Sequence, residues 1–238
     1  MKLDILAFAA HPDDVELGCG GTILKHIAQG KKVGIIDLTK GELGTRGNAE
    51  LRLKEATKAA KILGVVVREN LGFADGFFKN DKEHQLEIVK KIRLYQPEII
   101  LCNAHYDRHP DHSRASELIS DSCFFSGLSK IKTKHKNAEH PHWQPKAVYH
   151  YIQDRYIEPD FVIDISDYFE QKIEAVLCFR SQFYNPKSKE KKTSISTPEF
   201  LEFIKSRAVD FGRPIGAKYA EGFTVERHAG VRSLFDLE

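Results

Sequence analysis

The sequence predicts an α/β fold, in which a Rossmann-like, mostly parallel sheet carries helices on both faces. Short apolar segments typical of buried strands alternate with longer segments whose apolar residues recur at helical spacing. Such alternation is typical of parallel strands joined by right-handed crossovers. The chain has 238 residues, 41% of them hydrophobic, a size that suits one large domain better than two. We therefore expect a single domain over residues 1–238.

The first elements are strongly apolar. Leu3–Ala9 has the composition of a buried strand, and Val33–Leu38 is a second apolar run of strand length. Between them, Gly20–Gln29 has apolar residues three and four positions apart and stops before Gly30, so we expect a helix there.

Two further helix–strand pairs follow. Glu50–Leu63 is rich in Ala and Lys, which favour helices, and it precedes a short strand at Val65–Val67. Lys82–Tyr95 has apolar residues at helical spacing, and Pro97 separates it from a fourth strand at Glu98–Cys102.

The second half alternates less regularly. A helix is expected over Asp111–Phe125, and the polar stretch Lys130–Gln144 is expected to be a surface loop. The remaining elements, in order, are strands at Ala147–Ile152 and Phe161–Ile165, a helix capped by Ser or Asp at Asp167–Phe179, a loop at Asn185–Thr197, a helix opened by its proline at Pro198–Phe211, and a strand at Tyr219–Glu226.

Charge and cysteine usage exclude several classes of protein. The 36 basic and 34 acidic residues give a net charge of +2, which is no signal for nucleic acid or an anionic membrane. No run approaches the roughly 20 apolar residues of a membrane helix. The four cysteines are far apart and suggest neither a CxxC pair nor a disulfide framework. We expect a cytoplasmic protein that binds a small molecule, without nucleic acid or membrane partners.

Two short motifs carry the chemistry. An HPDD motif at residues 11–14 follows the apolar run Ile5–Ala10, and an HPDH motif at residues 109–112 follows Ile99–Cys102. In a parallel sheet of order 3-2-1-4-5 the first and fourth strands are neighbours, and their connections leave to opposite faces and open a crevice. Both motifs fall at that crevice. Imidazole and carboxylate groups suit zinc, so the sequence predicts a metal-dependent hydrolase.

The residues of the motifs suggest distinct roles. His11 and Asp14 are candidate metal ligands, and one more ligand is needed from the second motif. Spacing alone does not choose between His109 and His112, and the unbound one would act on the substrate. Asp13 is the natural general base. The neighbouring carboxylate at position 111 could orient an imidazole by accepting its other ring proton.

Each pattern has a plainer alternative. HPDD by itself also suits a loop with a helix cap. The stretch GCGG at residues 18–21 does not complete a dinucleotide-binding pattern, because Ile23 stands at its third glycine position, although Asp37 lies near the distance of a ribose-binding acid. These glycines are more typical of close helix packing and of amides exposed to an anion. His135, His140 and His142 are expected to be solvated loop residues.

The strings AHPDDVELGCGGTI and DRHPDH resemble the LmbE and PIG-L-like N-acetylglucosaminyl deacetylases, zinc enzymes that remove acetyl groups from amino sugars. The resemblance covers nearly the whole chain. Five longer strings resemble most the bacillithiol-pathway subgroup, which acts on N-acetylglucosaminyl malate: DLTKGELGTRG, ENLGFADGFF, YHYIQDRY, SQFY and YAEGFTVER.

The resemblance implies one Zn²⁺ per subunit, although iron, cobalt or manganese would accept the same ligands. It assigns roles to six residues: zinc ligands His11, Asp14 and His112, general base Asp13, His109 acting on the tetrahedral intermediate, and Arg52 holding the sugar. Arg46 and Arg108 flank the predicted crevice, and either could pair bidentately with the malate carboxylates.

The resemblance leaves three points open. Asp107 stands where the mycothiol-pathway relatives have a tyrosine, so the roles of the adjacent Tyr106 and of His105 are undecided. The substrate could instead be another acetylated sugar or a thiol conjugate cleaved by a metal-dependent amidase. The family implies a homo-oligomer, in many members a hexamer. A rival from another class is a catalytically silent sugar- or nucleotide-binding module, and a nicotinamide-dependent reductase has less support.

Overall fold

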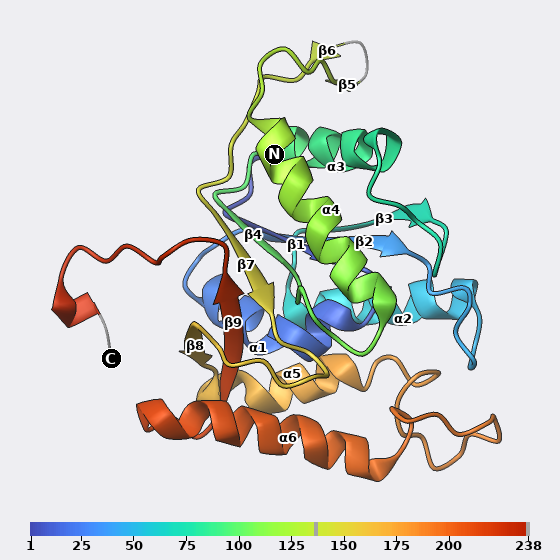
Figure 1. Ribbon diagram of the computed structural model, residues 1–238. Coiled ribbons are helices and arrows are strands. Elements are labelled where there is room, and N and C mark those ends of the chain that lie inside the picture. The colour runs from blue at the N-terminus through green and yellow to red at the C-terminus, as the bar shows by residue number, and fades with distance from the viewer. Residues whose placement is uncertain (136–137, 237–238) are drawn as a thin grey trace.

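In the computed structural model, which describes residues 1–135 and 138–236, the sheet that carries both motifs has seven strands in the order β3-β2-β1-β4-β7-β9-β8 (Figure 1). The strands from β3 to β7 are parallel, and β9 runs antiparallel to both of its neighbours. The predicted α/β class and the strand order 3-2-1-4-5 are confirmed. The strands are β1 Ile5–Ala9, β2 Val33–Thr39, β3 Val67–Phe73, β4 Ile99–Asn103, β7 Ala147–Tyr151, β8 Phe161–Asp164 and β9 Ala220–Val225.

Helices cover both faces of this sheet. In Figure 1, α3 and α4 lie on one face, whereas α1, α2 and α5 lie on the other, and α6 packs against β9 and β8. The helices are α1 Asp14–Ala28, α2 Ala49–Leu63, α3 Lys82–Tyr95, α4 Pro110–Ser126, α5 Phe169–Val176 and α6 Pro198–Gly212, with 3₁₀ turns at Ser166–Tyr168, Arg213–Ile215 and Leu234–Asp236.

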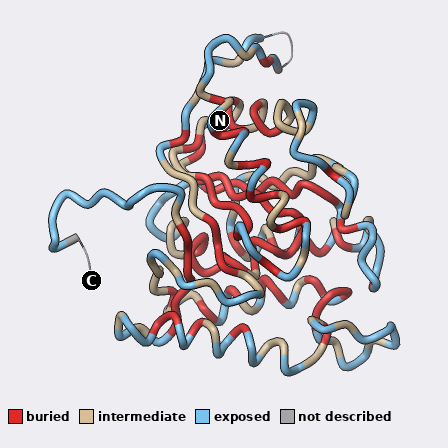
Figure 2. The backbone as a smooth tube through the Cα atoms, in the orientation of Figure 1, coloured by how far each residue is buried: buried red, intermediate tan, exposed pale blue. Residues whose placement is uncertain are grey.

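The core has two layers because successive residues of a strand point to opposite faces. In β1, Leu6 and Phe8 join the apolar cluster under α3 and α4, whereas Ile5 and Ala7 join the one under α1. Every residue of β1 is buried, as the red centre of Figure 2 shows. This explains why the strand has a continuous apolar run instead of an alternating one.

The structure corrects one strand prediction. β3 covers Val67–Phe73, so the expected strand at Val65–Val67 was wrong except for its last residue. β3 is an edge strand with polar residues, one of which, Arg68, turns inward to form ion pairs with Asp37 and Glu16. Apolar periodicity does not detect such a strand. Because both carboxylate oxygens of Asp37 accept hydrogen bonds from Arg68, they are not free to bind the hydroxyl groups of a ribose.

Three other predictions need smaller corrections. α1 begins at Asp14, six residues before the expected start at Gly20, and a break at Cys19 separates the two parts. The helix predicted at Asp167–Phe179 is α5 preceded by a 3₁₀ turn. The loop predicted at Lys130–Gln144 contains a small hairpin, β5 Lys134–His135 and β6 Ala138–Glu139. Residues 136–137 and the side chain of His135 lie outside what the structure describes, whereas His142 is exposed.

The described helices also bear on membrane insertion. None of those in residues 1–135 and 138–236 combines the length and the apolar character needed to cross a bilayer.

Candidate active site

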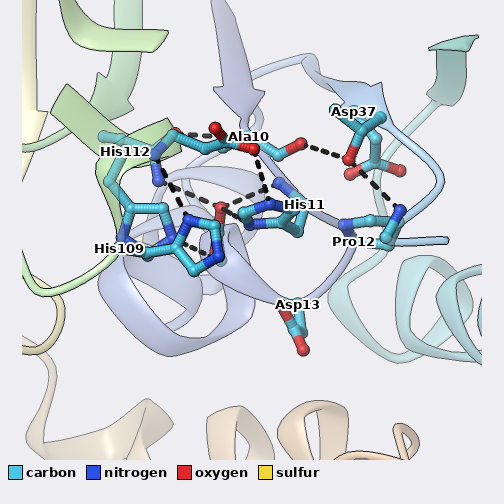
Figure 3. A network of polar contacts seen from close by, with 12 residues as sticks. Ala10, His11, Pro12, Asp13, Asp37, His109 and His112 are labelled. Atoms are coloured by element: carbon cyan, nitrogen blue, oxygen red, sulfur yellow. Dashed lines mark hydrogen bonds and ion pairs between the residues drawn. The ribbon is translucent and has the colours of Figure 1, made fainter. Parts of the chain in front are cut away.

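The two motifs meet where β1 and β4 end. The strands pair in parallel register, and the backbone N–H of Ala10 donates to Asn103 Oδ1 over 2.9 Å. α1 then leaves toward one face and α4 toward the other, which is the arrangement that opens a crevice in doubly wound sheets. Figure 3 shows the rings of His11, His109 and His112 side by side, with His11 centred 4.6 Å from His109 and 5.5 Å from His112.

Asp14 lies between two of these imidazoles. His112 Nε2 is 3.3 Å from Asp14 Oδ1, and His11 Nδ1 is 3.6 Å from Asp14 Oδ2. Two amides from neighbouring strand ends hold the carboxylate in place: Asn103 donates to its Oδ2 over 3.0 Å and Gln153 to its Oδ1 over 2.7 Å. Three atoms of ligand type therefore converge, and their direction is fixed by a surrounding layer of hydrogen bonds.

Other carboxylates are hydrogen-bonded to the ring nitrogens of His112 and His11 that face away from Asp14, called here the outer nitrogens. His112 Nδ1 lies 2.7 Å from Asp107 Oδ2, and His11 Nε2 lies 3.0 Å from Asp75 Oδ1 and 3.2 Å from Asp111 Oδ2. With a cation bound, these carboxylates would accept hydrogen bonds from the outer N–H groups, and the inner nitrogens of both histidines would present their lone pairs beside Asp14. The prediction that Asp111 orients an imidazole is thus met at His11.

The same carboxylates make the site favourable for positive charge. Burial opposes protonation of His112, but Asp14 and Asp107 outweigh it and raise its pKa to about 9. The pKa of His11 is likewise raised well above its usual value, against burial, by Asp111, Asp14 and Asp75. A cluster of imidazoles and carboxylates that favours positive charge is chemically suited to a divalent cation. The described residues include two groups of three possible ligands, His11, His109 and His112, and His11, Asp75 and Asp111.

Asp13 is buried beside this group in a strained conformation. Its φ of 125° lies in the left-handed region, which costs a non-glycine residue of order 1–3 kcal/mol. Arg52 Nη2 donates to Asp13 Oδ2 over 2.8 Å, and Arg52 Nε donates to the carbonyl of Pro12 over 3.1 Å. Burial and the charge of Asp14 raise the pKa of Asp13 to about 7, although Arg52 opposes them.

His109 differs from the other two histidines. It caps the start of α4, and its Nδ1 accepts the backbone N–H of Asp111 over 3.2 Å. Burial and the charges of His11 and His112 lower its pKa to about 4. The neutral ring must therefore carry its proton on Nε2 and act there as a hydrogen-bond donor.

A cavity of about 270 Å³ opens over these side chains. Both motifs line it together with the loop at residues 43–45, residues 193–195 and Phe200. The arginines differ in their relation to it. Arg52 lines it but is committed to Asp13, and Arg108 stands at its rim, 48% exposed, with Nε donating to Asp154 over 3.1 Å.

Arg46 is not brought to the cavity. Its Nη2 donates to Ser188 Oγ over 2.8 Å, and its Nε lies 3.6 Å from Glu190 Oε2. It therefore ties residues 46–47 to the segment at 188–190. Tyr106 is exposed beneath the guanidinium of Arg155, and His105 faces a separate depression with His150.

Sequence reasoning missed four residues of the site. Asn103 and Gln153 lie just after apolar strand runs, so the rule that ligands gather at the carboxyl ends of parallel strands could have found them. Asp107 was noted only for replacing a tyrosine, yet it orients His112. Asp75 gave no signal, because it comes from the loop after β3, 64 residues from His11.

The chain is similar in sequence and in fold to known proteins. The sequence profile of the family described as GlcNAc-PI de-N-acetylase, PIG-L, matches residues 6–123. Diacetylchitobiose deacetylase of Thermococcus kodakarensis is 32% identical over 229 residues, which are 92% of this chain and 81% of that protein.

Two further similarities bear on the fold and the subgroup. The crystal structure of the conserved protein TT1542 from Thermus thermophilus superposes with a TM-score of 0.85 at 35% identity, covering 97% of this chain and 98% of that one. A probable N-acetyl-alpha-D-glucosaminyl L-malate deacetylase 2 of Bacillus anthracis is 25% identical over 192 residues, 75% of this chain and 81% of that protein.

Proposed function

The chain belongs to the PIG-L/LmbE family of deacetylases, and from this premise we propose that it hydrolyses the N-acetyl group of an N-acetylglucosamine conjugate with the help of a metal ion. One observation carries the proposal: residues of the HPDD and HPDH motifs line one cavity, and among them is a strained, buried carboxyl, Asp13. This is the arrangement that amide hydrolysis requires of a general base next to a ligand cluster.

Neither of the two groups of possible ligands includes Asp14, yet we favour His11, Asp14 and His112, with zinc as the ion, because Asp14 lies 3.3 Å from His112 Nε2 and 3.6 Å from His11 Nδ1. Two imidazoles and one carboxylate form a common catalytic zinc set. His109 is the weaker candidate because its accepting Nδ1 leaves a proton on Nε2. When bound, the ion acts as a Lewis acid toward the acetyl carbonyl and makes water more acidic.

The chain's own residues move the protons. Asp13 accepts a proton at Oδ as water attacks the acetyl carbon, and Arg52 holds that carboxylate in position. His109 donates a hydrogen bond from Nε2 to the oxygen on which negative charge develops. When the C–N bond breaks, Asp13 returns the proton to the sugar nitrogen, and acetate and the free amine leave.

For the conjugate we propose malate as aglycone. Arg108 supports this because it lines the cavity and because, within the described part of the chain, its guanidinium donates a hydrogen bond only through Nε, to Asp154. Its two Nη groups can receive a carboxylate. Arg46 no longer belongs to this proposal, because Ser188 and Glu190 hold it. A neutral disaccharide is the alternative that the Thermococcus relative suggests.

The test is a substrate panel with the metal-loaded protein. Acetate and free amine are measured from N-acetylglucosaminyl malate, N,N′-diacetylchitobiose and an acetylated thiol conjugate. We expect release of acetate that stops when the metal is removed, with the highest kcat/KM for the malate conjugate and a raised KM for that substrate alone in Arg108→Gln. If no acetate appears from any substrate while metal is bound, the proposed function is wrong. Cytoplasmic location, homo-oligomerisation and one ion per subunit stay predictions.

A further inference from the structure

Helix α1, which carries Asp14 in its first turn, is broken in the middle. Cys19 has φ −145° and ψ 21°, outside the helical range, so residues 14–18 and 20–28 form two half-helices. A break of this kind leaves backbone groups without helical partners, carbonyls before it and N–H groups after it. The neighbourhood is buried, so those groups need partners within the protein.

Two buried charged side chains supply the partners. Glu221, on β9, accepts the N–H of Gly21 with Oε1 over 3.0 Å and the N–H of Thr22 with Oε2 over 2.7 Å. Lys172, on α5, donates to the carbonyl of Leu17 over 2.8 Å and to Glu221 Oε1 over 2.6 Å. Both residues are 3% exposed. The pair thus joins the two half-helices by binding the backbone on each side of the break.

The glycines around the break let each half pack on its own neighbour. A Cβ on Gly18 would come within 2.1 Å of the Tyr151 ring, and one on Gly21 within 2.7 Å of Ile165. Tyr151 is itself fixed, because its hydroxyl donates to the carbonyl of Phe8 over 2.9 Å. The first half-helix therefore rests on β7 and the second on the residue that follows β8. The anion at a helix start expected from GCGG is the carboxylate of Glu221.

We propose that Lys172 and Glu221 are positioning residues, which hold α1 broken so that its first half points Asp13 and Asp14 into the cavity. Figure 1 shows α1 between the sheet and α5, and Asp14, in the first turn of α1, lines the cavity. Asp14 must lie near His112 of α4, and Asp13 must meet Arg52 of α2. A continuous helix would swing both carboxylates away together. The inference rests on the metal site of the proposed function.

The experiment compares Glu221→Gln and Lys172→Met with a matched control. Arg93→Met also removes a buried cation that donates to backbone carbonyls, those of Ser126 and Leu128, but at the far end of α4. Zn²⁺ affinity is measured by competition with a chromophoric chelator, alongside kcat, KM and Tm. We expect kcat and Zn²⁺ affinity to fall by ~10-fold or more in both test variants, because displaced ligands and bases cost this much or more. Arg93→Met should lose Tm only.

A double variant separates positioning from plain stability. Lys172→Met with Glu221→Leu removes both charges and keeps the volume, so that neither charge is left buried without its partner. Positioning requires that kcat and Zn²⁺ affinity stay low, since the Leu17 carbonyl and the amides after the break lose their partners. If the double variant restores both quantities, or if the single variants lower Tm alone, the inference is overturned. Should the wild type release no acetate while the variants still bind Zn²⁺ more weakly, the proposed function fails and the inference stands.

Discussion

At the scale of single residues, carboxylates decide what each histidine of the site can do. Asp107 is hydrogen-bonded to one ring nitrogen of His112, and Asp75 and Asp111 are both hydrogen-bonded to one ring nitrogen of His11. His109 instead accepts a backbone N–H. The three rings are chemically identical, and their neighbours alone make two of them candidate ligands and the third a donor.

Asp107→Asn tests this directly. We expect Zn²⁺ affinity to fall ~10- to 100-fold, because the amide no longer fixes the ring proton of His112 on Nδ1. Affinity is measured by chelator competition. Asp121→Asn, the same change on the exposed surface of α4, is the control and should leave affinity unchanged. Equal affinity in both variants would contradict the role given to Asp107.

Asp13→Asn tests the general base. An amide cannot accept the proton from water, so kcat should fall ~100-fold or more while metal content is retained. Acetate release and metal analysis of the same preparation give the two readings. Full activity in this variant would remove Asp13 from the mechanism.

At the scale of elements, the broken helix α1 places the first motif. Gly18 and Gly21 are required there by close contacts with Tyr151 and Ile165. The edge strand β3 shows the complementary case, in which polar residues still form a strand because one of them, Arg68, finds buried partners in Asp37 and Glu16.

Gly18→Ala measures how tightly the first half-helix is seated. The added methyl would overlap the Tyr151 ring, and we expect the free energy of unfolding to fall by about 1–3 kcal/mol, as for other overpacked cores. Urea denaturation gives the value. Gly230→Ala, where nothing lies within 4 Å of the new methyl, is the control. An unchanged midpoint for Gly18→Ala would show that Tyr151 moves aside freely.

At the scale of the whole molecule, the site joins segments about a hundred residues apart. A metal ion held by His11, Asp14 and His112 would link β1, α1 and α4, none of which can hold it alone when the chain is unfolded. Metal binding should therefore stabilise the entire fold.

Thermal unfolding checks this expectation. Free Zn²⁺ at 100 times its Kd should add about 2.7 kcal/mol of stability, which appears as a raised Tm. Scans are run after chelation and after Zn²⁺ is restored. His112→Ala should show a much smaller shift. The same Tm with and without metal would argue against a site shared by the two motifs.

Much of this architecture could be predicted because it depends on local pattern. The apolar runs ending at Ala10 and Cys102 predicted β1 and β4, and the doubly wound order then made them neighbours. Because neighbouring parallel strands end side by side, HPDD and HPDH could be predicted to lie together without predicting the direction of any side chain.

The sequence by itself determined the α/β class, the strand ends at which the site lies, and the histidines and aspartates of the two motifs gathered there. It could do so because strand and helix periodicity are local properties of the chain. Only the tertiary structure decided that Asp75 and Asp107 orient the histidines, that Arg46 turns away, and that Lys172 and Glu221 bridge a broken helix. These depend on which remote side chains burial brings within hydrogen-bond distance, and no spacing along the chain encodes that.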